Sequence, residues 1–158
     1  WITHGHWDHT QHAALVARTT GAKIRAHLDD QRMIETPEIM RRYLGDDIQL
    51  EPAHVDAWVQ HGERFQMLGF DVEVRHVPGH CPGSVLYYFP QAQAAFVGDV
   101  LFNHSVGRTD LPGGKFEVLE NSIRTQVYTL PEPTTVYPGH GPSTTVMDEK
   151  LENPYVRA

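Results

Sequence analysis

The chain has 158 residues, 40% of them hydrophobic and 21% charged, which is the composition of one globular domain covering residues 1–158. A formal net charge of −7 argues against a nucleic-acid-binding surface, and the apolar runs are too short to span a bilayer. The single cysteine, Cys81, excludes an internal disulfide and favours a reducing compartment, so we expect a cytoplasmic protein without nucleic-acid or membrane partners.

The first predicted elements are two helices with a strand between them. A helix over residues 10–19 ends where Gly21 can adopt the left-handed conformation that terminates helices. Alternating apolar and charged residues predict a short strand over 22–27. A second helix is predicted over 29–44, with an interruption before Pro37, because proline disfavours helical backbone in the residue that precedes it.

Beyond residue 57 the apolar residues recur with a period of two, which is typical of strands. Strands are predicted over 57–59, 64–68, 70–76, 84–89, 94–97 and 134–137. The glycine- and proline-rich segment 98–114 is predicted to be a loop. It is followed by a helix over 115–130 with one apolar stripe, and a last helical segment contains Asp148 and Glu149. Strand meanders mixed with helices favour stacked α and β layers over an alternating βαβ sheet.

Four side chains that can bind a metal lie within six residues near the start of the chain: His4, His6, Asp8 and His9. Neutral imidazole is a good ligand for borderline metals such as zinc, and a carboxylate adds an oxygen ligand. A spacing of two residues suits a tight loop or a strand end, where alternate side chains point the same way. His4 and His6 are then on one side, and Asp8 and His9 can turn to the other. This short segment can therefore serve two neighbouring metals.

Three later strand ends carry further candidate ligands. Two prolines and two glycines fix the backbone around His80, an apolar strand ends in glycine followed by Asp99, and another strand runs into a Pro-Gly-His loop at His140. Taken singly, Asp99 is as well explained by a turn cap, and each histidine by an ordinary polar role. Functional side chains often project from loops at one edge of a rigid sheet. The recurrence therefore predicts that these three residues join the opening cluster.

The other histidines and the cysteine are given structural roles. His76 is explained as a residue that ends a strand or supports a ligand, and His12 as a capping or solvated residue. Ordinary polar roles are assigned to His27, His54, His61 and His104. Cys81 is predicted to be a packing residue, because nothing else in the sequence resembles a cysteine–histidine nucleophile system.

The opening His-x-His-x-Asp-His pattern, PGHCPGS, the Gly-Asp pair and PGHGPSTT together resemble the metallo-β-lactamase-fold hydrolases. Segment 105–114 is similar to the glyoxalase II (hydroxyacylglutathione hydrolase) branch. The resemblance implies an α+β fold, an αββα sandwich with a dinuclear centre at one edge. One metal is then held by His4, His6 and His80, the second by Asp8, His9 and His140, with Asp99 bridging them. A histidine at position 9 favours the thioesterase-like branches over true β-lactamases.

The sequence departs from that family at both ends. The family has N-terminal strands before the opening cluster, so we expect a sandwich that lacks them and has an exposed apolar sheet face. Larger glyoxalase II members also carry a C-terminal helical extension that binds glutathione, whereas this sequence stops without one. Recognition of glutathione therefore does not follow from the resemblance.

The expected activity is hydrolysis of a small-molecule thioester, such as a hydroxyacyl-glutathione, by a hydroxide that bridges two divalent ions. Zinc is the expected metal, with iron or manganese as alternatives. Asp8 and Asp99 are the predicted catalytic carboxylates, and Arg108 and Lys115 are expected to bind an anionic substrate unless they are ordinary surface charges. The alternatives are a persulfide dioxygenase with one iron and an inactive metal-binding fragment. No oligomeric state is predicted.

Overall fold

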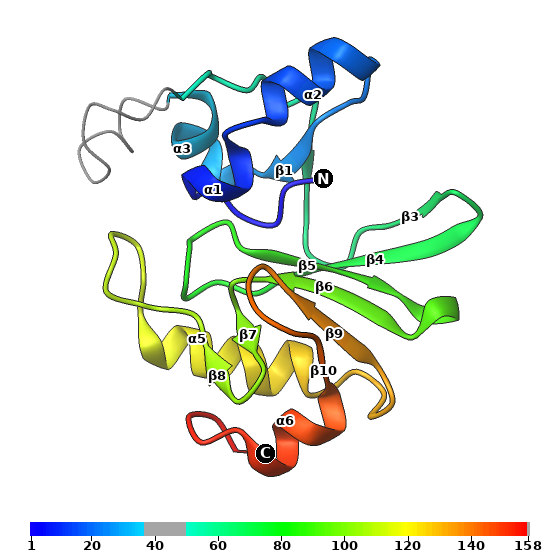
Figure 1. Cartoon of the computed structure of the whole chain (residues 1–158), viewed down its shortest axis with the longest axis vertical. Coiled ribbons are helices and arrows are strands. Elements are labelled where there is room, and N and C mark those ends of the chain that lie inside the picture. Colours follow the sequence, from blue (N-terminus) through cyan, green and yellow to red (C-terminus); the bar gives the residue numbers. More distant parts are fainter. Residues whose placement is uncertain (37–49, 158) are drawn as a thin grey trace.

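The computed structural model describes residues 1–36 and 50–157, and a six-stranded sheet with the order β10-β9-β6-β5-β4-β3 lies at its centre (Figure 1). The strands are β3 (Arg64–Met67), β4 (Phe70–His76), β5 (Val85–Phe89), β6 (Ala94–Gly98), β9 (Thr135–Pro138) and β10 (Thr144–Thr145). All neighbours pair antiparallel except β6 and β9, which are parallel. The parallel pair brings the ends of β6 and β9, and the loops that follow them, to one edge of the sheet.

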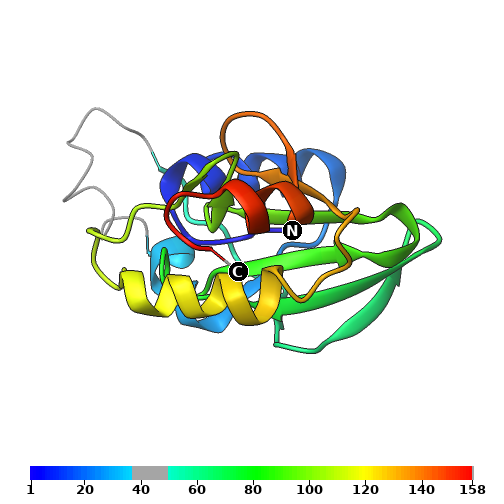
Figure 2. The ribbon, with the colours of Figure 1, turned by 90° about the horizontal axis from the view of Figure 1, so that it is seen from below.

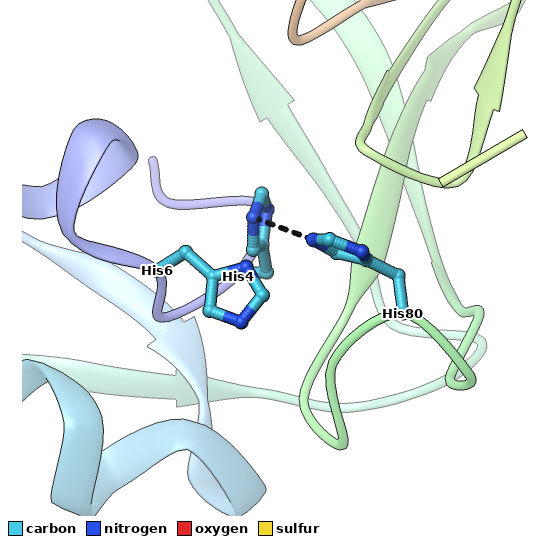
Figure 3. A group of neighbouring side chains, drawn as sticks. All are labelled: His4, His6 and His80. Atoms are coloured by element: carbon cyan, nitrogen blue, oxygen red, sulfur yellow. Dashed lines mark hydrogen bonds between the residues drawn. The ribbon is translucent and has the colours of Figure 1, made fainter. Parts of the chain in front are cut away.

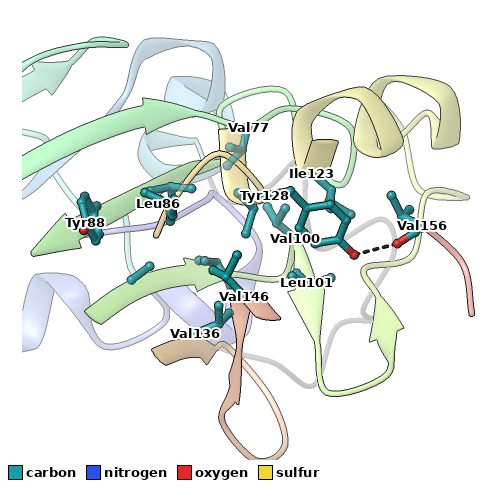
Figure 4. Close-up of a cluster of buried hydrophobic side chains, with 14 of the residues drawn as sticks. Val77, Leu86, Tyr88, Val100, Leu101, Ile123, Tyr128, Val136, Val146 and Val156 are labelled. Carbon is teal, nitrogen blue, oxygen red and sulfur yellow. Dashed lines mark hydrogen bonds between the residues drawn. The ribbon is translucent and has the colours of Figure 1, made fainter. Parts of the chain in front are cut away.

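One face of this sheet packs against the C-terminal helices α5 (Phe116–Ser122) and α6 (Val146–Glu152), and apolar residues from the sheet and the helices form the largest core cluster (Figure 4). The start of α6 is defined by Thr145, whose side chain accepts a hydrogen bond from the amide of Asp148. The hairpin of β3 and β4 extends beyond the area that these helices cover (Figure 2).

The second layer is a parallel pair of strands, β1 (Arg25–His27) and β2 (Ala57–Val59). On its outer side lie the helices α1 (Trp7–Thr10), α2 (Ala13–Thr20) and α3 (Gln31–Glu35), with a 3-10 turn at Leu28–Asp30 between β1 and α3 (Figure 1). A separate core cluster, which includes Ile24 and Ile34, fills the space between β1 and these helices. Val59 of β2 packs with Val74 and Tyr87 of the large sheet. The layers therefore follow the predicted order of helices, sheet, sheet and helices.

Residues 2–3 run between the two sheets and hold them together. The amide of Ile2 donates to the carbonyl of Arg25 in β1 (2.9 Å), and the amide of Val85 in β5 donates to the carbonyl of Thr3 (2.8 Å). The Tyr87 hydroxyl donates to the carbonyl of Ile2 (3.1 Å). The segment that leads into His4 is thus fixed on both sides by backbone hydrogen bonds.

Several predicted boundaries near the start of the chain are wrong. The first helix is divided, because α1 begins inside the metal-binding motif at Trp7 and α2 begins at Ala13, although Gly21 ends it as predicted with a φ of 74°. The predicted strand over 22–27 is shorter and covers Arg25–His27. The helix predicted from residue 29 ends at Glu35, before the proline, and its predicted continuation to residue 44 falls largely outside the described residues.

In the second half, the predicted loop over 98–114 contains a small hairpin, β7 (Leu101–Phe102) and β8 (Ser105–Val106). The helix predicted over 115–130 is present, but after α5 it widens into a π-helical turn over Ile123–Val127. Arg75 of β4 donates to the carbonyl of Gln126 in this turn (2.7 Å). The carbonyl is therefore satisfied by a residue from a distant strand, a contact that the local sequence does not reveal. Strand β10 was not predicted.

The face of the large sheet that carries Tyr87 has an exposed aromatic row, as expected. Phe96 and Tyr137 stack with their centroids 5.1 Å apart and are 45% and 42% exposed, and Phe89 meets Phe96 edge-on. Within residues 1–36 and 50–157, no helix combines the length and the apolar character that crossing a membrane requires.

Candidate metal centre

Three buried imidazoles form the first half of the site. His4 and His6 lie just before α1, and His80 lies in the loop between β4 and β5. The Nε2 atoms of His4 and His80 are 3.3 Å apart, and the His6 ring is 4.5 Å from the His80 ring between centroids (Figure 3). The three residues are only 2%, 7% and 2% exposed. Their rings converge from two distant parts of the sequence on one point.

A second group lies beside the first and is more open to solvent. Asp8 and His9 are on the first turn of α1, and His140 follows β9. The Nε2 of His140 is 3.0 Å from Oδ2 of Asp8, and the Nε2 of His9 is 3.4 Å from the same oxygen. The His140 side chain is 57% exposed, so a small molecule can approach this side of the site.

Asp99, which follows β6, lies between the two groups. Its Oδ2 is 3.8 Å from Nε2 of His80 and 3.5 Å from Nε2 of His140, and its Oδ1 is 3.3 Å from Nε2 of His9. The structure therefore brings together all seven of the side chains that the sequence singled out as metal ligands. Asp99 is thus close to side chains of both groups.

The electrostatics of the site favour neutral imidazoles in the buried group. Burial lowers the pKa of His6 to about 4, and burial together with the neighbouring imidazoles lowers the pKa of His4 well below its ordinary value. Burial also lowers the pKa of His80. His9 differs, because Asp99 and Asp8 outweigh the effect of burial and raise its pKa. At neutral pH the first group thus presents unprotonated nitrogen donors, as metal binding requires.

Three further observations agree with metal binding by these residues. His9 Nε2 and Asp99 Oδ1 are buried polar atoms 3.3 Å apart, and neither has another hydrogen-bond partner among the described residues. His80 Nδ1 donates to the carbonyl of Arg108 (2.8 Å), which leaves its Nε2 lone pair facing the site. The 3.3 Å between Nε2 of His4 and Nε2 of His80 matches neighbouring ligands on a tetrahedral zinc, about 3.3 Å for bonds of about 2.0–2.1 Å.

Two glycines, Gly98 and Gly139, allow the loops that carry Asp99 and His140 to lie close to the other side chains of the site. Gly98, with a φ of +56°, turns the chain at the end of β6 immediately before Asp99. A Cβ on Gly139 would collide with Oδ1 of Asp99 and with the His9 ring. The Gly139 amide also donates to the carbonyl of Gly98 (2.9 Å). Side chains at these two positions would keep the ligand-bearing loops apart.

Asp30 supports the site and was missed in the sequence, where it looked like an ordinary acidic residue near a helix start. It is fully buried, and its Oδ2 accepts the amide of Gly5 (2.8 Å) while its Oδ1 accepts the amide of Gly83 (2.7 Å). Gly5 lies between His4 and His6, and Gly83 lies three residues after His80. One carboxylate thus holds the two ligand-bearing segments of the buried group together.

Cys81 is completely buried and donates its thiol to Asp30. Burial, followed by the negative charge of Asp30, raises the pKa of the Cys81 thiol. We expect iodoacetamide at pH 8 to leave the native protein unmodified and to alkylate the denatured protein completely, because the thiolate is the reactive form. Mass spectrometry of the two samples measures this, and equal labelling rates would show that Cys81 is not the inert packing residue predicted.

The other candidate residues surround the centre. His76 ends β4, as predicted, and its Nε2 hydrogen-bonds the carbonyl of Pro82 (2.7 Å). Arg108 supports His80 through its backbone, while its exposed guanidinium pairs with Asp110 (2.7 Å). Lys115 is exposed and directly precedes α5. The roles of Arg108 and Lys115 in binding a substrate remain predictions.

Comparisons with known proteins agree with this geometry. Residues 1–140 match the sequence profile of the metallo-beta-lactamase superfamily. The chain is 36% identical over 160 residues to hydroxyacylglutathione hydrolase GloC of Haemophilus influenzae, with 99% of this chain and 74% of that protein covered.

Two solved structures are also similar. BLEG-1, a B3 metallo-beta-lactamase, matches with a TM-score of 0.90 and 37% identity over 99% of this chain and 75% of the other. TTHA1623 in a di-iron-bound form matches with a TM-score of 0.85 and 36% identity, over 98% and 75%. Together with the profile match, these similarities show that the chain belongs to the metallo-beta-lactamase superfamily, as its motifs predicted.

Proposed function

We propose that the chain is a dinuclear metallohydrolase that cleaves a small-molecule thioester, such as a hydroxyacyl-glutathione. The observation that carries this proposal is the position of Asp99 between two groups of ligands, within 3.8 Å of His80 and 3.5 Å of His140. Similarity to a hydroxyacylglutathione hydrolase supports the substrate class. The single cysteine supports a cytoplasmic location.

In this proposal one ion is held by His4, His6 and His80, the other by Asp8, His9 and His140, and Asp99 contacts both. Zinc suits this set of nitrogen and oxygen donors, and iron or manganese are alternatives, iron being the metal bound in TTHA1623. When bound, such ions act as Lewis acids and lower the pKa of coordinated water to near neutrality.

The chain's own residues supply orientation and proton transfer. The Asp8 carboxylate is 31% exposed and lies at the open side of the site, where it can orient the attacking water and accept its proton. A thiol has a pKa of about 8.5, so its thiolate can leave without a strong general acid. The buried imidazoles of His4, His6 and His80 exclude bulk water from the other side.

Metal content and turnover, measured on the same preparation, test the proposal. Two divalent ions per chain and release of free thiol from a hydroxyacyl-glutathione would support it. One iron per chain with oxygen uptake on a glutathione persulfide would instead indicate the dioxygenase. Faster turnover of a β-lactam than of the thioester would overturn the substrate class, and a preparation that retains no metal would indicate an inactive fragment.

Arg108 provides a test of substrate binding, because its backbone carbonyl holds His80 while its guanidinium is exposed and would have to exchange its pairing with Asp110 for a substrate anion. Arg108→Ala keeps that carbonyl, so we expect kcat to change little and KM to rise about 10-fold through loss of one charge-assisted hydrogen bond. Steady-state kinetics on the thioester measure the effect, with Lys115→Ala examined in parallel. Arg64→Ala, which removes an exposed arginine of β3, is the control. If the KM values of all variants were equal, Arg108 would be shown to be an ordinary surface charge.

A further inference from the structure

We propose that Glu149 of α6 is a positioning residue that holds the loops of Asp99 and His140, and with them the more open half of the metal centre, in place. This role rests on the proposed function, since it matters only if that half holds the second ion. Glu149 is none of the seven ligands, and the sequence indicated only that it belongs to a helix. It lies where α6, β10 and the hairpin of β7 and β8 meet (Figure 1).

The Glu149 carboxylate is completely buried and surrounded by hydrogen-bond donors. Its Oε1 accepts the Thr144 hydroxyl (2.7 Å), and its Oε2 accepts the side-chain amide of Asn153 (2.7 Å). The backbone amide of His104 lies within reach of both oxygens, at 3.0 and 3.2 Å. A buried carboxylate is costly unless its oxygens are satisfied, so separating these donors from it is unfavourable. Glu149 therefore fixes the positions of three segments relative to one another.

One of these segments is the hairpin that connects Asp99 to Arg108. At its base, the Gly107 amide donates to the carbonyl of Val100 (3.3 Å), and a Cβ on Gly107 would collide with the carbonyl of Asp99. At its tip, His104 has a φ of 55°, a left-handed conformation that is unusual for a residue with a side chain, and gives its amide to the buried carboxylate. Because the base is closed and the tip is anchored, the Asp99 end of the hairpin has little freedom to move.

The other segment is the loop that carries His140. Thr144 is the first residue of β10 and pairs with Val136 of β9, so the loop is closed by β9 at one end and by Thr144 at the other. The Phe102 ring of β7 lies next to the His140 ring, with centroids 6.4 Å apart and planes at 66°. The two segments that Glu149 joins therefore meet again at one of the candidate ligands.

Glu149 and Asp30 support different halves of the centre. Asp30 accepts the amides of Gly5 and Gly83, which lie in the segments that carry the three buried imidazoles. The hydrogen bonds to the Glu149 carboxylate come instead from residues 104, 144 and 153. Weakening the contacts of Glu149 should therefore loosen the open half of the centre and leave the buried half in place.

Glu149→Gln keeps the shape of the side chain but disturbs these contacts. Its NH₂ group must face a donor, either the side-chain amide of Asn153 or the backbone amide of His104. Asn153 cannot turn to avoid this, because its Oδ1 accepts the amides of Tyr155 and Val156 (2.9 and 3.1 Å). At least one of the three segments then loses its attachment.

Stepwise zinc affinity tests this role. Metal-free protein is titrated with Zn²⁺ against a competing chelator, which gives a separate affinity for each ion. We expect Glu149→Gln and Thr144→Val to weaken the second ion about 10-fold, the lower end of the loss seen when a residue orients a metal ligand, and to leave the first nearly unaffected. Thr144→Ser keeps the hydroxyl and should restore the affinity. The matched control is Glu152→Gln, which removes a 68% exposed carboxylate of the same helix, 3.8 Å from Nε2 of His104.

Hydrogen exchange of the metal-free proteins, measured by mass spectrometry, tests the same role without any ion. In Glu149→Gln, we expect peptides that cover residues 99–108 and 139–145 to exchange faster. Peptides that contain Gly5 and Gly83 should exchange as in the unmodified protein. Unchanged exchange in 99–108 and 139–145 would overturn the role of Glu149, and so would an equal increase along the whole chain, an unchanged affinity for the second ion or an equal loss of affinity for both ions.

Failure of the proposed function would be visible separately. An unmodified protein that binds fewer than two ions would contradict the dinuclear centre, while hydrogen exchange would still decide whether Glu149 fixes the two loops. If the circular dichroism spectrum shows that Glu149→Gln does not fold, the two variants of Thr144 decide the outcome. Faster exchange of 139–145 in Thr144→Val than in Thr144→Ser supports the role, and equal exchange in the two overturns it.

Discussion

Asp99→Asn is expected to lower kcat/KM for the thioester by more than about 100-fold, the upper end of the loss seen when a residue only orients a metal ligand. Asparagine keeps the shape of the side chain but removes the charge shared between His9, His80 and His140. The neutral amide is a poor bridging ligand, so bound metal should fall together with activity. Kinetics and elemental analysis on the same samples measure both quantities.

His80→Ala should have a comparable effect, because it removes a buried donor that lies 3.3 Å from its neighbour His4. His54→Ala, which removes an exposed imidazole, controls for the loss of a histidine as such. Retention of full metal content and turnover in Asp99→Asn and His80→Ala would eliminate the dinuclear mechanism.

Asp30→Asn is expected to destabilise the protein by about 2 kcal/mol or more, the cost of leaving a buried hydrogen-bonding group unsatisfied. Both oxygens of Asp30 accept backbone amides, from Gly5 and from Gly83. An asparagine can accept only one of these amides, because its NH₂ group must then face the other. Denaturant unfolding measures the loss of stability.

Activity should also fall in Asp30→Asn, by about 10- to 100-fold, because the two segments that carry His4, His6 and His80 lose their common support. Asp110→Asn, which removes an exposed carboxylate, is the charge control and should change stability by no more than about 0.5 kcal/mol. If Asp30→Asn unfolded at the same denaturant concentration as the unmodified protein, the supporting role of Asp30 would be refuted.

The seven residues of the centre could be predicted because their signal is local. His4, His6, Asp8 and His9 lie in one short segment, and Asp99 and His140 follow strands whose period-two patterns are clear in the sequence. Strand ends that share an edge bring such loops together, so the predicted strands indicated that these side chains would meet, and the family resemblance supplied the expected ligand set.

What the sequence did not reveal depends on contacts between distant segments. Asp30 looks like any acidic residue near a helix start, and only the packed structure brings the amides of Gly5 and Gly83 to its oxygens. Glu149 is a similar case, because it was predicted only as part of a helix. It is fully buried and accepts hydrogen bonds from Thr144 Oγ1 and Asn153 Nδ2, both at 2.7 Å.

The parallel pairing of β6 with β9 has a consequence for biosynthesis. His140 reaches the other ligands only after β9 has inserted beside β6, across more than a hundred residues from His4. In the proposed centre, the group of His4, His6 and His80 can form before residue 140 is in place, whereas the group of Asp8, His9 and His140 cannot, and contacts so distant in sequence form late. The two ions would then be captured in sequence, the second only after β9 has paired with β6.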